Sequence, residues 1–185
     1  MLLEQITLRN LLSFKDATVD LGPLNILIGE NTAGKTNLIE AISLLQATPG
    51  DFRTAILRGG GIRFWLWLGG EVPSPIATLA CRAHYDTESA PAHYTMEFFE
   101  DVGGMAILSE VVSGDSGELY LTRTNQSVTQ GAESGHQVES TRSVFSLIKS
   151  PFDPTPVYPV SAVSSKGFAS IGSFKRVRAL AAGWV

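Results

Sequence analysis

The sequence GENTAGKT, residues 29–36, constrains the possible folds of this chain more than any other feature. It matches the pattern G-x-x-x-x-G-K-[ST] in full. Glycines at both ends of such a loop permit backbone angles that a side chain would forbid, so successive amide N–H groups can turn inward around a phosphate. The pattern predicts a loop that holds the phosphates of a nucleoside triphosphate.

The residues on both sides of this loop support the prediction. Residues 24–28 form a short, nearly all-apolar run, which is typical of a strand buried on both faces. From Lys35 onward the period becomes helical, as shown by Leu38, Ile39, Ile42 and Leu45. The helix would aim the positive end of its dipole at the anion. Lys35 would place its ammonium against the outer phosphates, and Thr36 would offer a hydroxyl to Mg²⁺.

A wider string, LRNLLSFKDATVDLGPLNILIGENTAGKTNLIEAISLL at residues 8–45, carries a family resemblance. It resembles the amino-terminal segment of ABC-type ATPases of the RecF/SMC and OLD-like group, often described as AAA-type predicted ATPases. The similar features are FKD at residues 14–16, GPLNILIGEN before and into the loop, Asn37 followed by LIEAI, and the glycine-rich RGGGIRFWLWLGG at residues 58–70. The similarity covers residues 2–70.

The resemblance implies an α/β fold, namely an ABC-ATPase-like lobe of the P-loop NTPase superfamily with an antiparallel β subdomain. It implies ATP and Mg²⁺ as ligands. In a complete protein, two ATP molecules would be held between two copies, and ATP hydrolysis would drive their opening on DNA or on a partner effector. By position, Lys35 is the candidate catalytic residue and Thr36 the magnesium ligand. The nucleotide-binding candidates are Gly29, Glu30, Asn31, Thr32, Ala33, Gly34, Lys35, Thr36 and Asn37. Lys15 matches a basic position that in relatives lies near nucleotide or DNA, although a lysine in a surface turn is the simpler explanation.

Three other parts of such ATPases have no clear counterpart in this chain. Relatives carry an apolar strand that ends in Asp-Glu. Here the acids Glu100 and Asp101 stand in the reverse order, and the apolar run before them is interrupted. An alternating strand followed by a solvated turn explains these residues better. The glycine segments at residues 68–71 and 113–117 do not match the expected S-G-G signature. The histidines His84, His93 and His136 all precede the expected switch position, and the first two are expected at the surface. We therefore expect the front part of a longer ATPase head, or a truncated gene product.

The expected organisation is a partial ATPase head over residues 1–185. Residues 1–50 form the strand, phosphate loop and helix, and residues 51–125 form a glycine-rich segment and antiparallel strands. Residues 113–143 are predicted to be a flexible loop or insertion, although residues 119–124 could form another strand. Residues 144–185 are Pro-rich and then basic, without an acid after Asp153. The strands expected after the helices lie near residues 77–82, 94–100 and 105–112.

Three functions follow from these features. The first is ATP binding, with hydrolysis in the complete protein. The second is a nucleotide-binding interaction module that does not hydrolyse ATP. The third is a small P-loop kinase, which would need an arginine-bearing lid and a helix-rich second half, whereas this sequence continues as strands.

Composition excludes several other classes. The net charge of −4 supplies no overall attraction to nucleic acid, and no apolar run approaches the roughly 20 residues of a membrane span. A single cysteine, Cys81, cannot form an internal disulfide and favours a cytoplasmic location. One Cys and three scattered His residues offer no metal-ligand spacing. We expect Cys81 to be a buried structural thiol, and Trp65 and Trp67 to pack beneath the glycine loop rather than stack a base.

Overall fold

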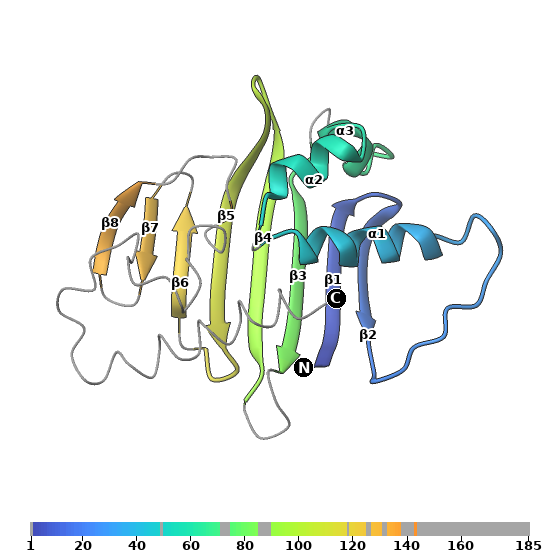
Figure 1. The fold of residues 1–185 in the computed structure, drawn as a ribbon, viewed down its shortest axis with the longest axis horizontal. Coiled ribbons are helices and arrows are strands. Elements are labelled where there is room, and N and C mark those ends of the chain that lie inside the picture. The colour runs from blue at the N-terminus through green and yellow to red at the C-terminus, as the bar shows by residue number, and fades with distance from the viewer. Residues whose placement is uncertain are drawn as a thin grey trace.

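The structure, a computed structural model, describes residues 2–48, 50–70, 75–84, 90–117, 119–124, 127–130, 133–137 and 143. They form one antiparallel sheet in the order β2-β1-β3-β4-β5-β6-β7-β8 (Figure 1). The strands are β1 Leu2–Leu11, β2 Phe14–Asp20, β3 Ala77–His84, β4 Ala92–Asp101, β5 Gly104–Gly114, β6 Leu119–Thr124, β7 Ser127–Gln130 and β8 Glu133–Gln137. Three helices lie between β2 and β3 in the sequence: α1 Lys35–Gln46, α2 Phe52–Arg58 and α3 Ile62–Trp65.

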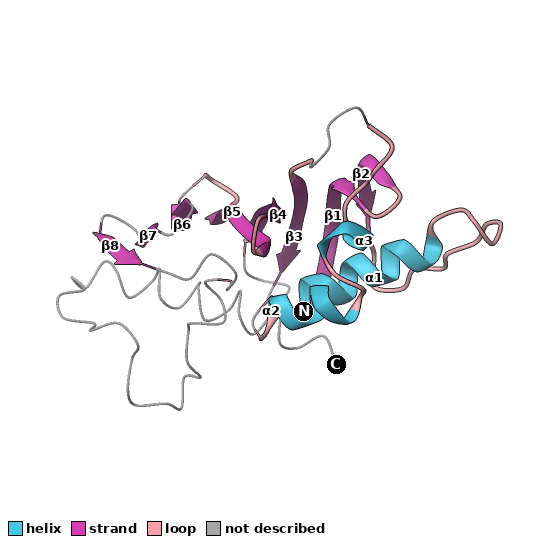
Figure 2. Ribbon diagram, turned by 90° about the horizontal axis from the view of Figure 1, so that it is seen from above, coloured by secondary structure: helices cyan, strands magenta, loops and turns pink. Residues whose placement is uncertain are grey.

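The helices pack on one face of the sheet, over the end that contains β1 to β4 (Figure 2). Alternation along the strands supplies the apolar side chains of this face, including Ile6 of β1, Leu79 of β3 and Met96 of β4, which are fully buried. The facing stripe of α1 contains Leu38, Ala41, Leu44 and Leu45, which are also buried. The core therefore lies between the sheet and the helices, and it anchors α1 close to β1.

Residues 51–70 contain α2 and α3, which are joined by three glycines, Gly59 to Gly61. The carboxylate of Asp51 caps α2 by accepting a hydrogen bond from the Thr54 amide at 3.0 Å. Phe52, in the first turn of α2, packs edge-on against Phe98 of β4, with 5.4 Å between ring centroids. These contacts place α2 over the centre of the sheet and leave the glycine loop at its C-terminal end.

The prediction of a buried strand at residues 24–28 is wrong in this structure. The segment is irregular and exposed, and Leu24, Ile26 and Ile28 expose 82%, 76% and 90% of their surface. Asn25 links back to Gly22 through two hydrogen bonds of 2.8 and 2.9 Å, so the chain turns directly after β2. A buried strand also needs partner strands on both sides, and none pairs with this segment among the described residues.

The predicted flexible loop at residues 113–143 is also incorrect over much of its length. Strands β6, β7 and β8 continue the sheet there by successive antiparallel pairing. Backbone hydrogen bonds can add such hairpin strands to an existing edge without many large apolar side chains. The strand expected at residues 119–124 is confirmed. The Pro-rich and basic segment, residues 144–185, lies outside the described residues.

The observed class is α/β with a predominantly antiparallel sheet, in agreement with the expected antiparallel part of the fold. Strands β3, β4 and β5 occupy the positions that the sequence indicates, each a few residues longer than expected. In the described part of the chain, no helix has the length and apolarity needed to cross a membrane.

Candidate phosphate-binding site

The glycine-rich loop leads directly into the N-terminus of α1. Gly34 occupies the N-cap position with φ of 84°, a left-handed conformation that glycine adopts without a steric penalty. No side chain caps this helix, and its first turn carries no acidic residue. The first amide N–H groups of α1 therefore lack a side-chain acceptor, which is the arrangement that an anion can complete.

The ammonium of Lys35 lies inside the loop that precedes it. Lys35 Nζ donates to the carbonyl oxygen of Gly29 at 2.6 Å and to that of Glu30 at 2.5 Å. A lysine ammonium has three N–H donors, so two loop carbonyls fix its position and one donor remains for an anion. The loop is also closed on itself, because the Ala33 amide donates to the Glu30 carbonyl at 3.1 Å.

The remaining loop residues surround this ammonium at the surface. Gly29, Glu30, Asn31, Thr32 and Ala33 are all exposed, as is Thr36. A Cβ on Gly29 would lie 3.3 Å from the Cβ of Ala33, so the backbone at the start of the loop is tightly folded. The structure thus brings Lys35 together with Gly29 and Glu30, while roles for Asn31, Thr32, Ala33, Thr36 and Asn37 as ligand contacts remain predictions.

The turn between β1 and β2 forms the wall behind the loop. A Cβ on Gly34 would lie 3.2 Å from Ser13 Oγ and 3.6 Å from Cζ of Phe14. Sequence reasoning did not assign a role to Ser13. The only sequence signal was that the strand ends in a polar turn with an aromatic residue at the family's FKD position.

The aromatic segment after α2 is fastened to the same end of β1. The Leu12 amide donates to the Trp65 carbonyl at 2.6 Å, and the Trp67 amide donates to the Asn10 carbonyl at 3.0 Å. Trp65 is buried beneath the glycine loop, and its indole N–H donates to the Ile56 carbonyl at 3.1 Å. The expected core role of Trp65 is confirmed, whereas Trp67 is only half-buried.

A cavity of about 650 Å³ lies between α1, the β1–β2 turn and the aromatic segment. Its lining residues come from four elements of the chain: Leu12, Ser13, Asn37, Glu40, Ser43, Arg58, Gly59, Phe64 and Trp65. Its volume falls within the usual range for small-molecule sites, and the lining combines aromatic, charged and amide groups. Asn37, predicted to contact nucleotide, is part of this wall.

Lys15 lies in β2 with its ammonium 5.7 Å from the centroid of the Trp67 ring, a cation–π contact. The contact explains how this lysine is held on the protein surface. Its placement near nucleotide or DNA remains a prediction.

The acids Glu100 and Asp101 lie at the β4–β5 hairpin, as expected for a strand with a solvated turn. Glu100 accepts a hydrogen bond from Arg63 Nε at 2.8 Å, and Asp101 accepts one from the Val102 amide at 2.7 Å. Glu100 also raises the pKa of the Arg63 guanidinium through this hydrogen bond and its negative charge. Both acids thus have local structural partners at the hairpin.

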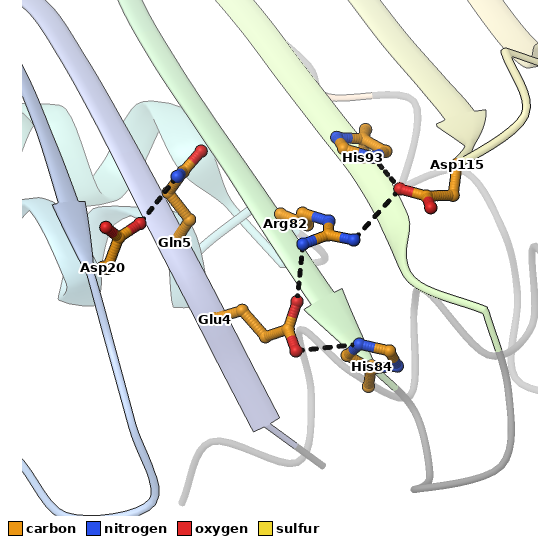
Figure 3. A network of polar contacts seen from close by, with 7 residues as sticks. All are labelled: Glu4, Gln5, Asp20, Arg82, His84, His93 and Asp115. Atoms are coloured by element: carbon orange, nitrogen blue, oxygen red, sulfur yellow. Dashed lines mark hydrogen bonds and ion pairs between the residues drawn. The ribbon is translucent and has the colours of Figure 1, made fainter.

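The opposite face of the sheet carries a polar network on β1, β3 and β4 (Figure 3). His84 contacts Glu4 at 2.9 Å, and His93 contacts Asp115 at 3.0 Å, so both histidines lie near the surface as expected. Arg82 joins the two pairs through Glu4 at 3.1 Å and Asp115 at 3.2 Å. The hydrogen bond from His93 and the charge of Arg82 lower the pKa of Asp115. The side chain of His136 lies outside the described residues.

The donor set fits Mg²⁺ only together with nucleotide phosphates. Among the described residues, no group of three or more His, Cys, Asp or Glu side chains could hold a metal ion. Mg²⁺ is commonly bound through one or two protein oxygens plus substrate phosphates and water. The exposed hydroxyl of Thr36, at the second position of α1, is compatible with one such ligand.

Comparisons with known proteins agree with this picture. The AAA ATPase domain family matches residues 1–107, more than half of the chain. The DNA replication and repair protein RecF of Magnetococcus marinus is 35% identical over 111 residues, which are 58% of this chain and 25% of that protein. RecF of Lactococcus lactis subsp. cremoris MG1363 is 47% identical over 49 residues, which are 26% of this chain and 14% of that protein.

A solved structure from a study of ATP-driven dimerization and DNA-stimulated activation of SMC ATPases aligns with 63% of this chain and 70% of its own. Its sequence identity is 16% and its TM-score 0.42. The chain spans a quarter or less of the length of the two RecF relatives. The match over residues 1–107 is nevertheless specific, and the chain belongs to the AAA ATPase domain family.

Proposed function

We propose that this chain binds Mg·ATP through residues 29–37, and that hydrolysis takes place in a longer protein. One observation carries the proposal: Lys35 Nζ is held by the Gly29 and Glu30 carbonyls at the start of an uncapped helix. Two loop carbonyls position the cation before a ligand arrives, so little side-chain freedom is lost on binding. The exposed N–H groups of the loop and α1 supply complementary donors for the phosphates.

Each predicted residue has a distinct task in this proposal. Lys35 neutralises charge on the outer phosphates, which is the contribution that phosphoryl transfer needs most from a protein. Thr36 supplies one oxygen to Mg²⁺, and Gly34 lets the chain enter the helix with its N–H groups facing the anion. Mg·ATP itself would supply the transferable phosphoryl group and the metal charge.

Hydrolysis also requires a group that orients the attacking water. Glu100 and Asp101 are the paired acids that come nearest to the pattern expected for this step, and their contacts at the β4–β5 hairpin favour a structural role. This observation favours, as second candidate, a nucleotide-binding module that does not hydrolyse ATP. A small P-loop kinase is disfavoured, because β3 to β8 follow the helices as antiparallel strands.

For the longer protein we propose a homodimer with two ATP molecules at its interface and DNA or an effector as partner. The RecF relatives are DNA replication and repair proteins, which supports DNA as the first partner to test. A cytoplasmic location remains a prediction.

The test is calorimetric titration of Mg·ATP into the 185-residue chain and into Lys35→Ala, with phosphate release followed in the same samples. Arg53→Ala is the matched control, because it removes one exposed cation from α2, outside the loop. We expect binding by the wild type and by Arg53→Ala, loss of binding in Lys35→Ala, and no turnover. Equal binding by Lys35→Ala would contradict the proposal. Turnover by the chain alone would instead return Glu100 and Asp101 to consideration as catalytic acids.

A further inference from the structure

Ser13 connects the cavity beside α1 with the end of the phosphate loop. Ser13 lines the cavity and also lies against Gly34, the last loop residue before Lys35. Asn37 lines the cavity from the first turn of the same helix. Glu40 lies one turn farther along, and the α-helical rise of 1.5 Å per residue separates its backbone from that of Lys35 by about 7.5 Å along the helix axis. That span is comparable to a ribose and part of a base.

The far side of the cavity presents an exposed aromatic ring. Phe64 exposes 73% of its surface, although it is a large apolar residue. A Cβ on Gly60, which has a φ of 95°, would lie only 2.9 Å from Cδ2 of Phe64. The ring is therefore held against the Gly60 backbone, while most of its surface stays open to a ligand.

The charged groups in the cavity lining also remain available. Neither Glu40 nor Arg58 has an ion-pair partner among the residues that the structure describes. A carboxylate accepts hydrogen bonds, as from an amino group on a base, and a guanidinium donates them, as to ribose or phosphate oxygens. The lining thus offers a stacking ring, an acceptor and a donor in one cavity.

We propose that this cavity receives the nucleoside of the nucleotide whose phosphates the loop holds, with Phe64 stacking on the base. This inference rests on the proposed function, because it extends the ligand of that same site. The two hydrogen bonds that fasten Leu12 to Trp65 and Trp67 to Asn10 hold the turn wall and the aromatic wall together. The nucleoside therefore enters a cavity whose walls are already joined at the end of β1.

Glu40 accepts a hydrogen bond from the amino group of the base, and Arg58 contacts ribose or phosphate oxygens from the opposite wall. Aromatic stacking by itself tolerates any base, so Phe64 contributes affinity rather than base selection. Glu40 contributes selection, because a base without an N–H donor at that edge leaves the carboxylate unpaired.

The experiment compares Mg·ATP with Mg·tripolyphosphate, which carries three phosphates and no nucleoside. Both are titrated into the 185-residue chain, Phe64→Ala, Lys35→Ala and Leu57→Ala. Leu57 is the matched control, since it is a large apolar residue of α2, 59% exposed and outside the cavity lining. We expect Phe64→Ala to weaken Mg·ATP about tenfold or more, as for loss of one base–aromatic stack. Its affinity for Mg·tripolyphosphate should equal that of the wild type.

Lys35→Ala should weaken both ligands, which separates failure of the phosphate site from failure of the nucleoside site. Equal affinity of the wild type for the two ligands would overturn the inference and leave the phosphate site in place. Equal effects of Phe64→Ala and Leu57→Ala on Mg·ATP would also overturn it. Binding of neither ligand by the wild type would reject the proposed function, and this inference with it.

A second variant tests base selection in the same cavity. The triphosphate of purine riboside lacks the adenine amino group and therefore offers no N–H donor at that edge. The wild type should bind ATP more tightly than this analogue, and Glu40→Ala should bring the ratio of the two affinities close to one. An unchanged preference in Glu40→Ala would remove Glu40 from the site and leave only Phe64 to be tested by the tripolyphosphate comparison.

Discussion

The hydroxyl of Ser13 lies against the backbone of Gly34, so closely that a Cβ on Gly34 would fall 3.2 Å from Ser13 Oγ. The contact joins the β1–β2 turn to the end of the phosphate loop. It also means that two separate properties of Gly34, its left-handed φ of 84° and its lack of a side chain, determine how α1 begins.

We therefore expect Gly34→Ala to lose Mg·ATP binding and to destabilise the fold by about 1–2 kcal/mol, the cost of a left-handed non-glycine residue. Urea unfolding and calorimetric titration measure the two effects. Gly103→Ala is the control, because Gly103 has no atom within 4 Å of the added Cβ and no positive φ. Wild-type affinity in Gly34→Ala would show that the loop tolerates another entry into α1.

Gly59→Ala should disturb the aromatic wall of the cavity. A Cβ at Gly59 would overlap Nε1 of Trp65, so the buried indole must move and lose its hydrogen bond to Ile56. Overpacking of this kind costs about 1–3 kcal/mol, measurable by urea unfolding followed through tryptophan fluorescence. Gly50→Ala, whose Cβ would meet Ala47 at an ordinary 3.6 Å, should be nearly neutral. Equal stability of the two variants would contradict the tight packing at Gly59.

Breaking the buried pair Glu110 and Arg123 should lower the free energy of unfolding strongly. Both side chains are fully buried, Arg123 Nη1 lies 3.7 Å from Glu110 Oε2, and the Tyr94 hydroxyl donates to Glu110 at 2.8 Å. Glu110→Leu should cost about 3–5 kcal/mol in urea unfolding, because it removes a buried carboxylate that pairs with the buried Arg123 guanidinium. Replacing both members by Leu and Met should recover much of that loss.

Glu97→Leu is the control for the pair, since Glu97 is half-buried and accepts a hydrogen bond from Ser109 at 2.7 Å. It should cost about 1 kcal/mol, the typical value of one hydrogen bond. A comparable loss in Glu97→Leu and Glu110→Leu would mean that the buried charge of Arg123 is accommodated in another way.

Cys81 should make the fold less stable at alkaline pH. Cys81 is half-buried rather than fully buried, and the desolvation of its thiol raises the pKa from 9.0 to about 12, opposed by a hydrogen bond with the backbone of Tyr94. The contribution of the protonated thiol to the free energy of unfolding is full below pH 9 and declines as the pH rises toward 12. The decline occurs because the unfolded chain then loses a proton that the folded chain keeps. Cys81→Ala should flatten the decline in urea-unfolding free energy between pH 9 and 10.5. An identical pH profile would contradict the raised pKa.

The same raised pKa predicts slow reaction of Cys81 with thiol reagents at pH 8, because the thiolate is the reactive form. Labelling should become fast when urea unfolds the chain. Fast labelling of the folded protein at pH 8 would show that the thiol is accessible and ionises normally.

Several elements could be predicted from the sequence because their information is local. The left-handed Gly34, the lysine after it and the helical spacing from Leu38 onward all lie within one short stretch. The alternation in β3, β4 and β5 is equally local, since side chains of a strand point to opposite faces in turn. The position of Glu100 at the end of an alternating strand followed from the same kind of pattern.

Other features depended on residues far apart in the chain. Residues 24–28 have the composition of a buried strand, but burial requires partner strands, and composition does not supply them. Strands β7 and β8 have few apolar signals, and they form because β6 offers an edge to which backbone groups can bond. In each case the deciding interaction is pairing between strands, which a local pattern does not report.

The sequence by itself determined the glycine-rich loop at residues 29–36, the helix that follows it and the family to which the chain belongs. Only the tertiary structure placed Ser13 behind Gly34 and brought Glu40, Arg58 and Phe64 around one cavity. The physical reason is that loop conformation and helix initiation depend on neighbouring residues. A cavity instead depends on how β1, α1 and α3 pack, and that packing is set by contacts across many residues of chain.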